Sequence, residues 1–223
     1  MSDSAVAGGA PVGLLGGTFD PIHLGHLRCA LELLEGLALA ELRLVPGRIP
    51  PHRPPPRAPA ALRLALVERA VAGVPGLRAD DRELRRDGPS YTVDTLAEVR
   101  AELGSRPLCF VLGSDAFLGL PTWHRWRELT DHAHLVVMER PGSGAQACRE
   151  LAQWLAPRRA RAAGQLRREP AGRVLFFPVT SLDISASVLR RRLALGQSGR
   201  WLLPEPVWSE IAAGHVYGYP QVE

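Results

Sequence analysis

The residues with the clearest chemical potential are two histidines, His23 and His26, which follow a glycine-rich turn. The turn contains Gly16 and Gly17 and comes after an apolar run, residues 12–15, that predicts a short buried strand. The leucines after His23 recur at helical spacing, so the two imidazoles fall where a helix begins. Backbone N–H groups at a helix start, beside glycines that allow a close approach, favour a bound phosphate.

Two imidazoles in this position can donate hydrogen bonds to phosphate oxygens and stabilise charge that grows on phosphorus. One alternative is a zinc site, which needs three or four ligands. The three cysteines, Cys29, Cys109 and Cys148, include no Cys-x-x-Cys pair, which disfavours zinc. The other alternative is that both histidines serve only the helix start, where polar residues are common.

The segment from Gly16 to His26 resembles the phosphate-binding motif of the bacterial nicotinate-nucleotide adenylyltransferases, a family of the HxGH nucleotidyltransferases. The resemblance implies that His23 and His26 are catalytic and steady the α-phosphate of ATP. The ATP-binding residues that it implies here are Gly16, Gly17, Thr18, Phe19, His23, Gly25 and His26. Several nucleotidyltransferases share such a motif, so other segments must indicate the second substrate.

Five further segments resemble the same family in the same order, and the resemblance extends from about residue 12 to residue 219. They are Ile49-Pro50-Pro51-His52-Arg53, Asp87 to Leu96, Gly113 to Trp123, Arg140-Pro141-Gly142, and Ile184 to Arg190. The resemblance implies further ATP contacts at Gly113, Asp115, Ile184, Ser185, Ser187 and Arg190, with Arg190 counted as catalytic. It implies contacts to the second substrate at Arg53, Tyr91, Thr92 and Trp123.

Some of these segments also carry a prediction of their own. Ser185 and Ser187 precede an apolar and basic run, which predicts a capped helix start with Arg190 one turn in. An ordinary capped surface helix is the alternative for that segment. The proline-rich residues 50–57 predict a stiff loop, and a plain linker is the alternative there. Trp123 and Trp126 would share a helix face, and Trp126 is expected in the core.

Strand and helix signals alternate along the chain, which predicts an α/β fold with a parallel sheet flanked by helices on both faces. The same Rossmann-like fold, with a small helical part at the C-terminus, is implied by the resemblance. We expect a flexible segment at residues 1–11 and a single domain over residues 12–219. Expected strands cover residues 12–15, 41–45, near 77, 108–112, 134–138 and 173–177, and expected helices begin at 24 and cover 60–72, 92–103, 145–155, 187–194 and 206–213. His23, Asp115 and Ser185 should converge at the carboxyl ends of the strands.

Composition fits an intracellular enzyme. The net charge is +4, and all 27 basic residues are arginine, so we read the charge as compositional bias and expect no nucleic acid partner. The arginines of residues 158–168 are expected on a solvated face. No signal peptide and no membrane-spanning run is apparent, and scattered cysteines suit the cytoplasm. A homodimer remains open.

The resemblance implies that the chain transfers the adenylyl group of ATP to nicotinate mononucleotide, which yields nicotinate adenine dinucleotide and pyrophosphate in NAD biosynthesis. Mg²⁺ is expected on the ATP phosphates, without a dedicated protein metal site. Transfer to nicotinamide mononucleotide or to phosphopantetheine is an alternative, although Ser90-Tyr91-Thr92 and Trp123 argue against phosphopantetheine. A nucleotide-binding module without turnover is an alternative from another class.

Overall fold

The computed structural model describes residues 9–48, 55–139 and 147–220, and within them one parallel sheet organises the chain. Its seven strands lie in the order β3-β2-β1-β4-β5-β7-β6. The strands are β1 (Val12–Gly17), β2 (Glu41–Pro46), β3 (Leu77–Ala79), β4 (Leu108–Gly113), β5 (His134–Glu139), β6 (Arg159–Ala160) and β7 (Val174–Pro178).

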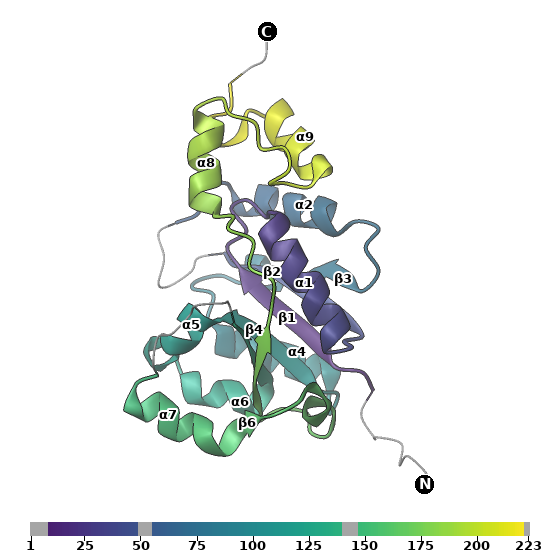
Figure 1. The fold of residues 1–223 in the computed structure, drawn as a ribbon, viewed down its shortest axis with the longest axis vertical. Coiled ribbons are helices and arrows are strands. Elements are labelled where there is room, and N and C mark those ends of the chain that lie inside the picture. The colour runs from purple at the N-terminus through teal and green to yellow at the C-terminus, as the bar shows by residue number, and fades with distance from the viewer. Residues whose placement is uncertain (1–8, 49–54, 140–146, 221–223) are drawn as a thin grey trace.

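Helices connect the strands and cover both faces of the sheet (Figure 1). The α-helices are α1 (Leu24–Gly36), α2 (Ala60–Val71), α3 (Arg82–Arg85), α4 (Thr92–Leu103), α5 (Ser114–Leu118), α6 (Leu129–His132), α7 (Arg149–Leu155), α8 (Ala186–Ala194) and α9 (Glu205–Ala213). Five 3-10 turns join them among the described residues, namely η1 (Leu120–Thr122), η2 (Trp126–Glu128), η3 (Ala156–Arg158), η4 (Ala163–Arg167) and η5 (Val216–Gly218). Helices α8 and α9 gather at the opposite end of the molecule from α6 and α7 (Figure 1).

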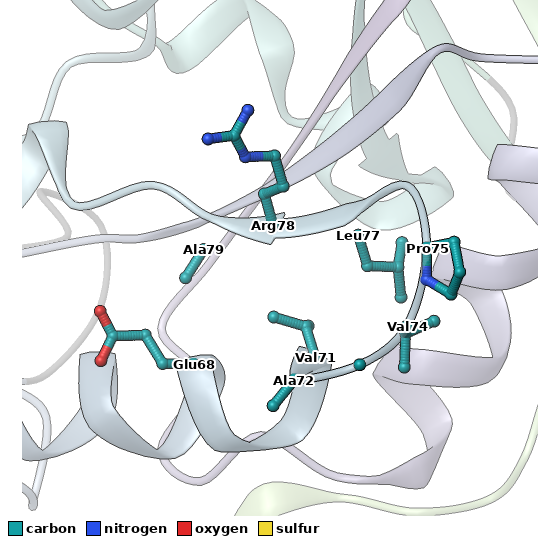
Figure 2. A pocket seen from close by; sticks show the side chains of 9 residues that line it. Glu68, Val71, Ala72, Val74, Pro75, Leu77, Arg78 and Ala79 are labelled. Atoms are coloured by element: carbon teal, nitrogen blue, oxygen red, sulfur yellow. The ribbon is translucent and has the colours of Figure 1, made fainter.

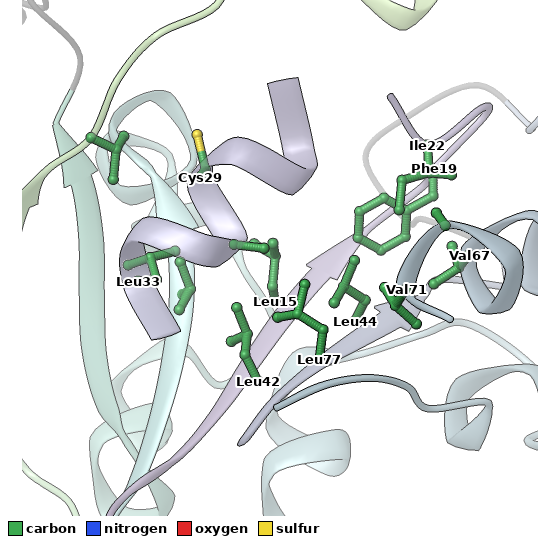
Figure 3. Close-up of a cluster of buried hydrophobic side chains, with 14 of the residues drawn as sticks. Leu15, Phe19, Ile22, Cys29, Leu33, Leu42, Leu44, Val67, Val71 and Leu77 are labelled. Carbon is green, nitrogen blue, oxygen red and sulfur yellow. The ribbon is translucent and has the colours of Figure 1, made fainter. Parts of the chain in front are cut away.

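Successive side chains of each strand point to opposite faces of the sheet, so the strands contribute to two hydrophobic cores, one on each face. Leu15 packs into a core with α1, α2, α8 and α9, whereas its neighbour Leu14 packs into the core beneath α4 and α6. Figure 3 shows the first core around strands β1 and β2, where Phe19 and Ile22 join it from the histidine segment. The segment that carries His23 is therefore anchored in the core through Phe19 and Ile22.

The strand order changes direction between β1 and β4. Strands β2 and β3 continue to one side of β1, while β5 and β7 continue to the other side of β4. In a parallel α/β sheet, ligands bind at the carboxyl ends of the two strands that flank such a reversal. Gly16 and Gly17 end β1, and Gly113 ends β4, so both glycine turns lie at this crevice.

The expected fold class and every expected strand and helix are present, with ends shifted by a few residues. The helix expected over residues 145–155 is observed from Arg149, and residues 145 and 146 lie outside the described residues. Residues 1–8 of the expected flexible segment also lie outside them. Over the part of the chain that is described, no helix is long and apolar enough to cross a membrane.

One expectation for the tryptophan segment was wrong. Trp123 and Trp126 share no helix face, because Trp123 is extended and Arg125 adopts left-handed backbone angles between η1 and η2. Trp126 is nevertheless in the core, as expected. The arginines of residues 158–168 lie on a solvated face as expected, since none of them is buried. Arg158 lies 4.8 Å above the Trp154 ring and Arg159 lies 5.0 Å above the Phe176 ring.

Candidate active site

The loop after β1 is fixed by the ring of Phe19. This residue has a positive φ of 46° and its side chain is buried in the core. A Cβ atom at Gly17 would stand 2.8 Å from the Phe19 ring, which is closer than non-bonded carbon atoms approach. Glycine at position 17 therefore lets the chain fold back tightly over Phe19. The main chain of the turn stays accessible at Gly16, which is exposed.

His23 and His26 lie at the start of α1, as predicted, and their rings stack with centroids 3.7 Å apart. The backbone N–H of His23 donates to Nδ1 of His26 over 3.3 Å. Because Nδ1 accepts, a neutral His26 carries its ring proton on Nε2, which is then a hydrogen-bond donor. The ring edge of His26 also meets Phe19, with centroids 5.1 Å apart. This pair is held at the positive end of the α1 dipole.

Gly25 allows the start of α8 to approach the start of α1. A Cβ at Gly25 would stand 3.1 Å from the imidazole of His23 and 3.7 Å from Cβ of Ile184. The two predicted phosphate-type helix starts are therefore neighbours in space. Ser185 is the N-cap of α8, and its hydroxyl lies 2.8 Å from that of Ser187.

Arg190 extends from α8 to the histidine segment. Its Nη1 donates to the carbonyl oxygen of Asp20 over 2.6 Å and lies 3.6 Å from Oδ2 of the same residue. The guanidinium is about a quarter exposed, whereas the Asp20 carboxylate is 4% exposed. The structure thus brings Arg190 to the same end of the sheet as His23 and His26, which is where the sequence predicted it.

Asp20 is a central residue of the site that the sequence analysis did not single out. Its Oδ2 accepts the backbone N–H of Arg57 over 2.7 Å, and its Oδ1 accepts that of Ala58 over 3.0 Å. The hydroxyl of Tyr217 donates to Oδ1 over 2.8 Å. With Arg190, these contacts join the loop before α2 and the end of the chain to the histidine segment. Its position inside the recognised motif was the available signal.

Arg63 stabilises the loop between β1 and α1 through a hydrogen bond. The side chain is buried in α2, and its Nη1 donates to the carbonyl oxygen of Thr18 over 2.7 Å. Burial lowers the pKa of the Arg63 guanidinium, while the nearby Asp20 carboxylate opposes that change. Arg63 precedes the buried Leu66 by three residues and Val67 by four, so it lies on the apolar face of α2. This spacing could have predicted from the sequence that Arg63 is buried.

A second set of contacts joins the histidine segment to the expected substrate segment. The N–H of Gly47, after β2, donates to the carbonyl oxygen of Gly17 over 2.9 Å. The next residue, Arg48, donates its backbone N–H to Oγ of Ser90 over 3.1 Å. Tyr91 is the N-cap of α4 and Thr92 is its first residue. The first N–H groups of a helix have no carbonyl partner one turn earlier, so this start suits a carboxylate.

Aromatic rings line the region between β4 and the start of α4. Phe110 lies next to Gly16, and its ring meets the edge of Trp123 with centroids 6.4 Å apart. Tyr91 and His124 are 4.4 Å apart between ring centroids. Trp123 is half-buried, so part of its ring remains accessible for stacking. His124 was not proposed as a site residue from the sequence.

The remaining expected contacts are only partly described. Asp115 is exposed in the first turn of α5, at the carboxyl end of β4, and Ser114 beside it donates to the carbonyl oxygen of Met138 over 2.8 Å. Asp115 is therefore at the expected edge of the sheet. Arg53 and the segment 140–142 lie outside the described residues.

A groove elsewhere on the molecule does not contribute to this site. It has a volume of about 540 Å³ and lies between the C-terminal end of α2 and strand β3. Figure 2 shows Val71, Val74 and Leu77 along it, with Glu68 and Arg78 at its sides. Its lining includes no residue of the segment that carries His23 and His26.

The chain is similar to several known proteins. Residues 14–192 match the family described as cytidylyltransferase-like. A protein of Halorhodospira halophila named "Probable nicotinate-nucleotide adenylyltransferase" is 57% identical over 95% of this chain and 97% of its own length. A protein of the same name from Pseudomonas aeruginosa is 51% identical over 95% of this chain and 99% of its own length. The nicotinic acid mononucleotide adenylyltransferase of Plasmodium falciparum, solved with NaAD, shares the fold with a TM-score of 0.71 at 15% identity, covering 96% of this chain and all of that one.

Proposed function

Because the chain belongs to the nicotinate-nucleotide adenylyltransferase family, we propose that it joins the adenylyl group of ATP to nicotinate mononucleotide, giving nicotinate adenine dinucleotide and pyrophosphate in NAD biosynthesis. One observation carries the proposal. The helix starts of α1 and α8 meet at the strand-order reversal, where the stacked His23 and His26 and the side chain of Arg190 face the same loop. Two helix starts and three nitrogen-bearing side chains suit a polyphosphate.

The reaction needs positioning and charge stabilisation more than covalent chemistry by the protein. An oxygen of the 5′-phosphate of the mononucleotide forms a bond to the α-phosphorus of ATP. The bond from that phosphorus to the bridging oxygen breaks, and pyrophosphate leaves with the electron pair. Orientation of two reactants alone is worth about 7–11 kcal/mol in favourable cases. We assign His26 Nε2–H to an α-phosphate oxygen, where it would stabilise the growing negative charge.

Arg190 is assigned to the leaving phosphates, together with the hydroxyls of Ser185 and Ser187. In the structure its guanidinium is held by Asp20, and its part-exposed edge is the group available to an anion. The backbone of Gly16 and Gly17 and residues Thr18 and Gly25 would contribute close main-chain contacts.

We propose that Mg²⁺ enters with ATP as part of the substrate. Mg²⁺ usually keeps several water ligands and binds proteins through substrate phosphates and one or two carboxylates. Asp20 is a poor candidate ligand because its oxygens already accept from Arg57, Ala58 and Tyr217. The exposed carboxylate of Asp115, in the nucleotide-binding edge, is the better candidate for a contact to the metal or its waters.

The second substrate is assigned to the region between Trp123 and the start of α4. The Trp123 ring would stack on the cationic pyridine ring. The backbone N–H of Tyr91 already donates to the carbonyl oxygen of Pro89 over 3.1 Å, so the N–H groups from Thr92 onward would receive the nicotinate carboxylate. The helix dipole favours this anion, which an uncharged amide would not replace. This pairing supports nicotinate over nicotinamide. Arg53 stays a prediction for this region.

Turnover with the two mononucleotides side by side tests the proposal. We expect pyrophosphate release with ATP and nicotinate mononucleotide, and a kcat/KM at least about tenfold lower with nicotinamide mononucleotide, the effect of losing about 1.4 kcal/mol. A preference for the amide would overturn the substrate assignment. Tight ATP binding without pyrophosphate release from either substrate would favour a non-catalytic nucleotide-binding module.

We further propose a reducing, cytoplasmic location. The exposed thiol of Cys148 forms no disulfide, and unpaired exposed thiols are typical of reducing compartments. Whether the chain forms a homodimer stays a prediction, which sedimentation of the purified protein would test.

A further inference from the structure

Glu83 is a carboxylate outside the residues assigned to the substrates, yet it contacts the segment that holds two of them. It lies on the short helix α3, between β3 and α4. Thr95 of α4 donates its hydroxyl to Oε1 of Glu83 over 2.8 Å, and the hydroxyl of Ser90 also hydrogen-bonds to this carboxyl group. These two hydroxyls lie on either side of Tyr91 and Thr92 in the sequence.

The neighbours of the two hydroxyls set the direction of both hydrogen bonds. Ser90 Oγ accepts the backbone N–H of Arg48 over 3.1 Å, and Thr95 Oγ1 accepts Nη1 of Arg86 over 3.2 Å. Because each hydroxyl oxygen already accepts a hydrogen bond, each hydroxyl proton is directed at Glu83. The other acceptor near Thr95, the carbonyl oxygen of Tyr91, is farther away, at 3.5 Å. Glu83 thus accepts twice, which a carboxylate can do and an amide nitrogen cannot.

Glu83 also reaches the loop that follows β2. Its Oε2 lies 3.5 Å from the position that a Cβ on Gly47 would occupy, and Gly47 in turn donates its N–H to Gly17 of the phosphate loop. One carboxylate therefore contacts the loop before α4 and the first turn of α4, and it lies beside the loop after β2. Burial raises the pKa of Glu83, while the hydrogen bonds from Thr95 and Ser90 oppose that change.

We propose that Glu83 is a positioning residue for the mononucleotide substrate, because it fixes Ser90, Tyr91 and the start of α4 against the loop after β2. It touches no reacting atom, and it acts through the Ser90 and Thr95 hydroxyls. The proposal rests on the substrate assignment made above for Tyr91 and Thr92. Since the phosphate loop has its own supports in Asp20 and Arg63, the effect of Glu83 should be confined to the mononucleotide side of the site.

The test is the steady-state kinetics of Glu83→Gln with both substrates. Glutamine keeps the length of the side chain but presents an NH₂ group to one of the two hydroxyls. We expect KM for nicotinate mononucleotide to rise about tenfold, the usual effect of one misdirected buried hydrogen bond, with KM for ATP unchanged within about twofold. Glu102→Gln is the matched control, because Glu102 lies on α4 and pairs with Arg43 and Arg82. It removes the same charge and should leave both KM values unchanged.

A second variant separates positioning from simple loss of folding. Ser90→Ala should raise KM for the mononucleotide by a similar factor. The double variant should have a KM no higher than either single variant, because both substitutions break the same hydrogen bond between Ser90 and Glu83. Equal rises in both KM values with a lowered melting temperature, or additive effects in the double variant, would overturn the proposal. An unchanged mononucleotide KM in Glu83→Gln would also overturn it. Turnover by the wild-type protein tests the proposed function separately.

Discussion

The hydroxyl of Tyr217 donates a 2.8 Å hydrogen bond to Oδ1 of Asp20, although 197 positions separate the two residues in the sequence. The final 3-10 turn of the described chain is therefore fastened to the loop that carries the histidines. The same carboxylate accepts the backbone N–H groups of Arg57 and Ala58. Asp20 is thus a structural junction between the first strand, the loop before α2 and the end of the chain.

Replacing Tyr217 by phenylalanine should lower the free energy of unfolding by about 1 kcal/mol at neutral pH, the net value of one hydrogen bond. Burial raises the pKa of Tyr217, and the neighbouring Asp20 charge raises it further. The unfolded chain then releases this proton near pH 10 while the folded chain retains it, so the wild type loses stability as pH rises above about 10. Urea unfolding at pH 8 and pH 10.5 measures this. The stability difference between wild type and Tyr217→Phe should shrink at the higher pH, and a constant difference would contradict the buried phenol.

His26 has two functions in the structure that two substitutions can separate. Its Nδ1 accepts the N–H of His23 at the start of α1, and its Nε2–H is assigned to the α-phosphate. Asparagine can retain an acceptor in the position of Nδ1 but has no group at Nε2, whereas alanine retains neither. We expect both His26→Asn and His26→Ala to lower kcat by about 100-fold or more, the usual loss for one transition-state donor.

Only the alanine variant should lose stability, by about 1 kcal/mol, since it alone removes the cap. Thermal melting of the two variants beside a pyrophosphate-release assay makes both measurements. Near-normal turnover in either variant would remove His26 from the proposed chemistry.

The two tryptophans of the segment after β4 should respond in opposite ways. Trp126 is 5% exposed in the core, so Trp126→Ala should lower the free energy of unfolding by about 3–5 kcal/mol. Trp123 is half-buried and is assigned to the pyridine ring, so Trp123→Ala should mainly raise KM for the mononucleotide. Loss of a stacked ring costs about 1–3 kcal/mol in comparable ring-stacking sites. Trp201, which is 87% exposed, provides a control in Trp201→Ala. A Trp123→Ala variant with a normal mononucleotide KM would contradict the stacking role.

The sequence predicted what depends on local pattern. Apolar runs and helical spacing predicted the long strands and helices, and the glycine turn before His23 predicted the position of the site. Short elements such as α3, α5 and β6 were not predicted, because segments of two to five residues carry no measurable periodicity. The left-handed backbone at Arg125 also has no local signal, so the tryptophans were wrongly expected on one helix face.

Tertiary partnerships of the site were the other part that the sequence could not provide. In the sequence, Tyr217 has no feature that distinguishes it from other aromatic residues. The packing of η5 beside α8 brings its hydroxyl to Asp20. The link from Glu83 to Ser90 likewise depends on how α3 turns after β3. Arg63 differs, since a charged residue on an apolar helix face is a pattern that could be read in advance.

Arg190 and its neighbour Arg191 provide the sharpest comparison of a site arginine with a surface arginine. Arg190 reaches Asp20 from α8, whereas Arg191 is exposed on the same helix. Lysine keeps the positive charge beside the buried carboxylate but loses the planar fork that can contact Asp20 and a phosphate at once. We expect Arg190→Lys to lower kcat/KM for ATP about tenfold or more, as for loss of one charge-assisted hydrogen bond, with little change in melting temperature. Arg191→Lys should leave both quantities unchanged. If the two variants behave alike, Arg190 does not bind the leaving phosphates. If Arg190→Lys lowers only the melting temperature, Arg190 stabilises Asp20 and has no part in binding ATP.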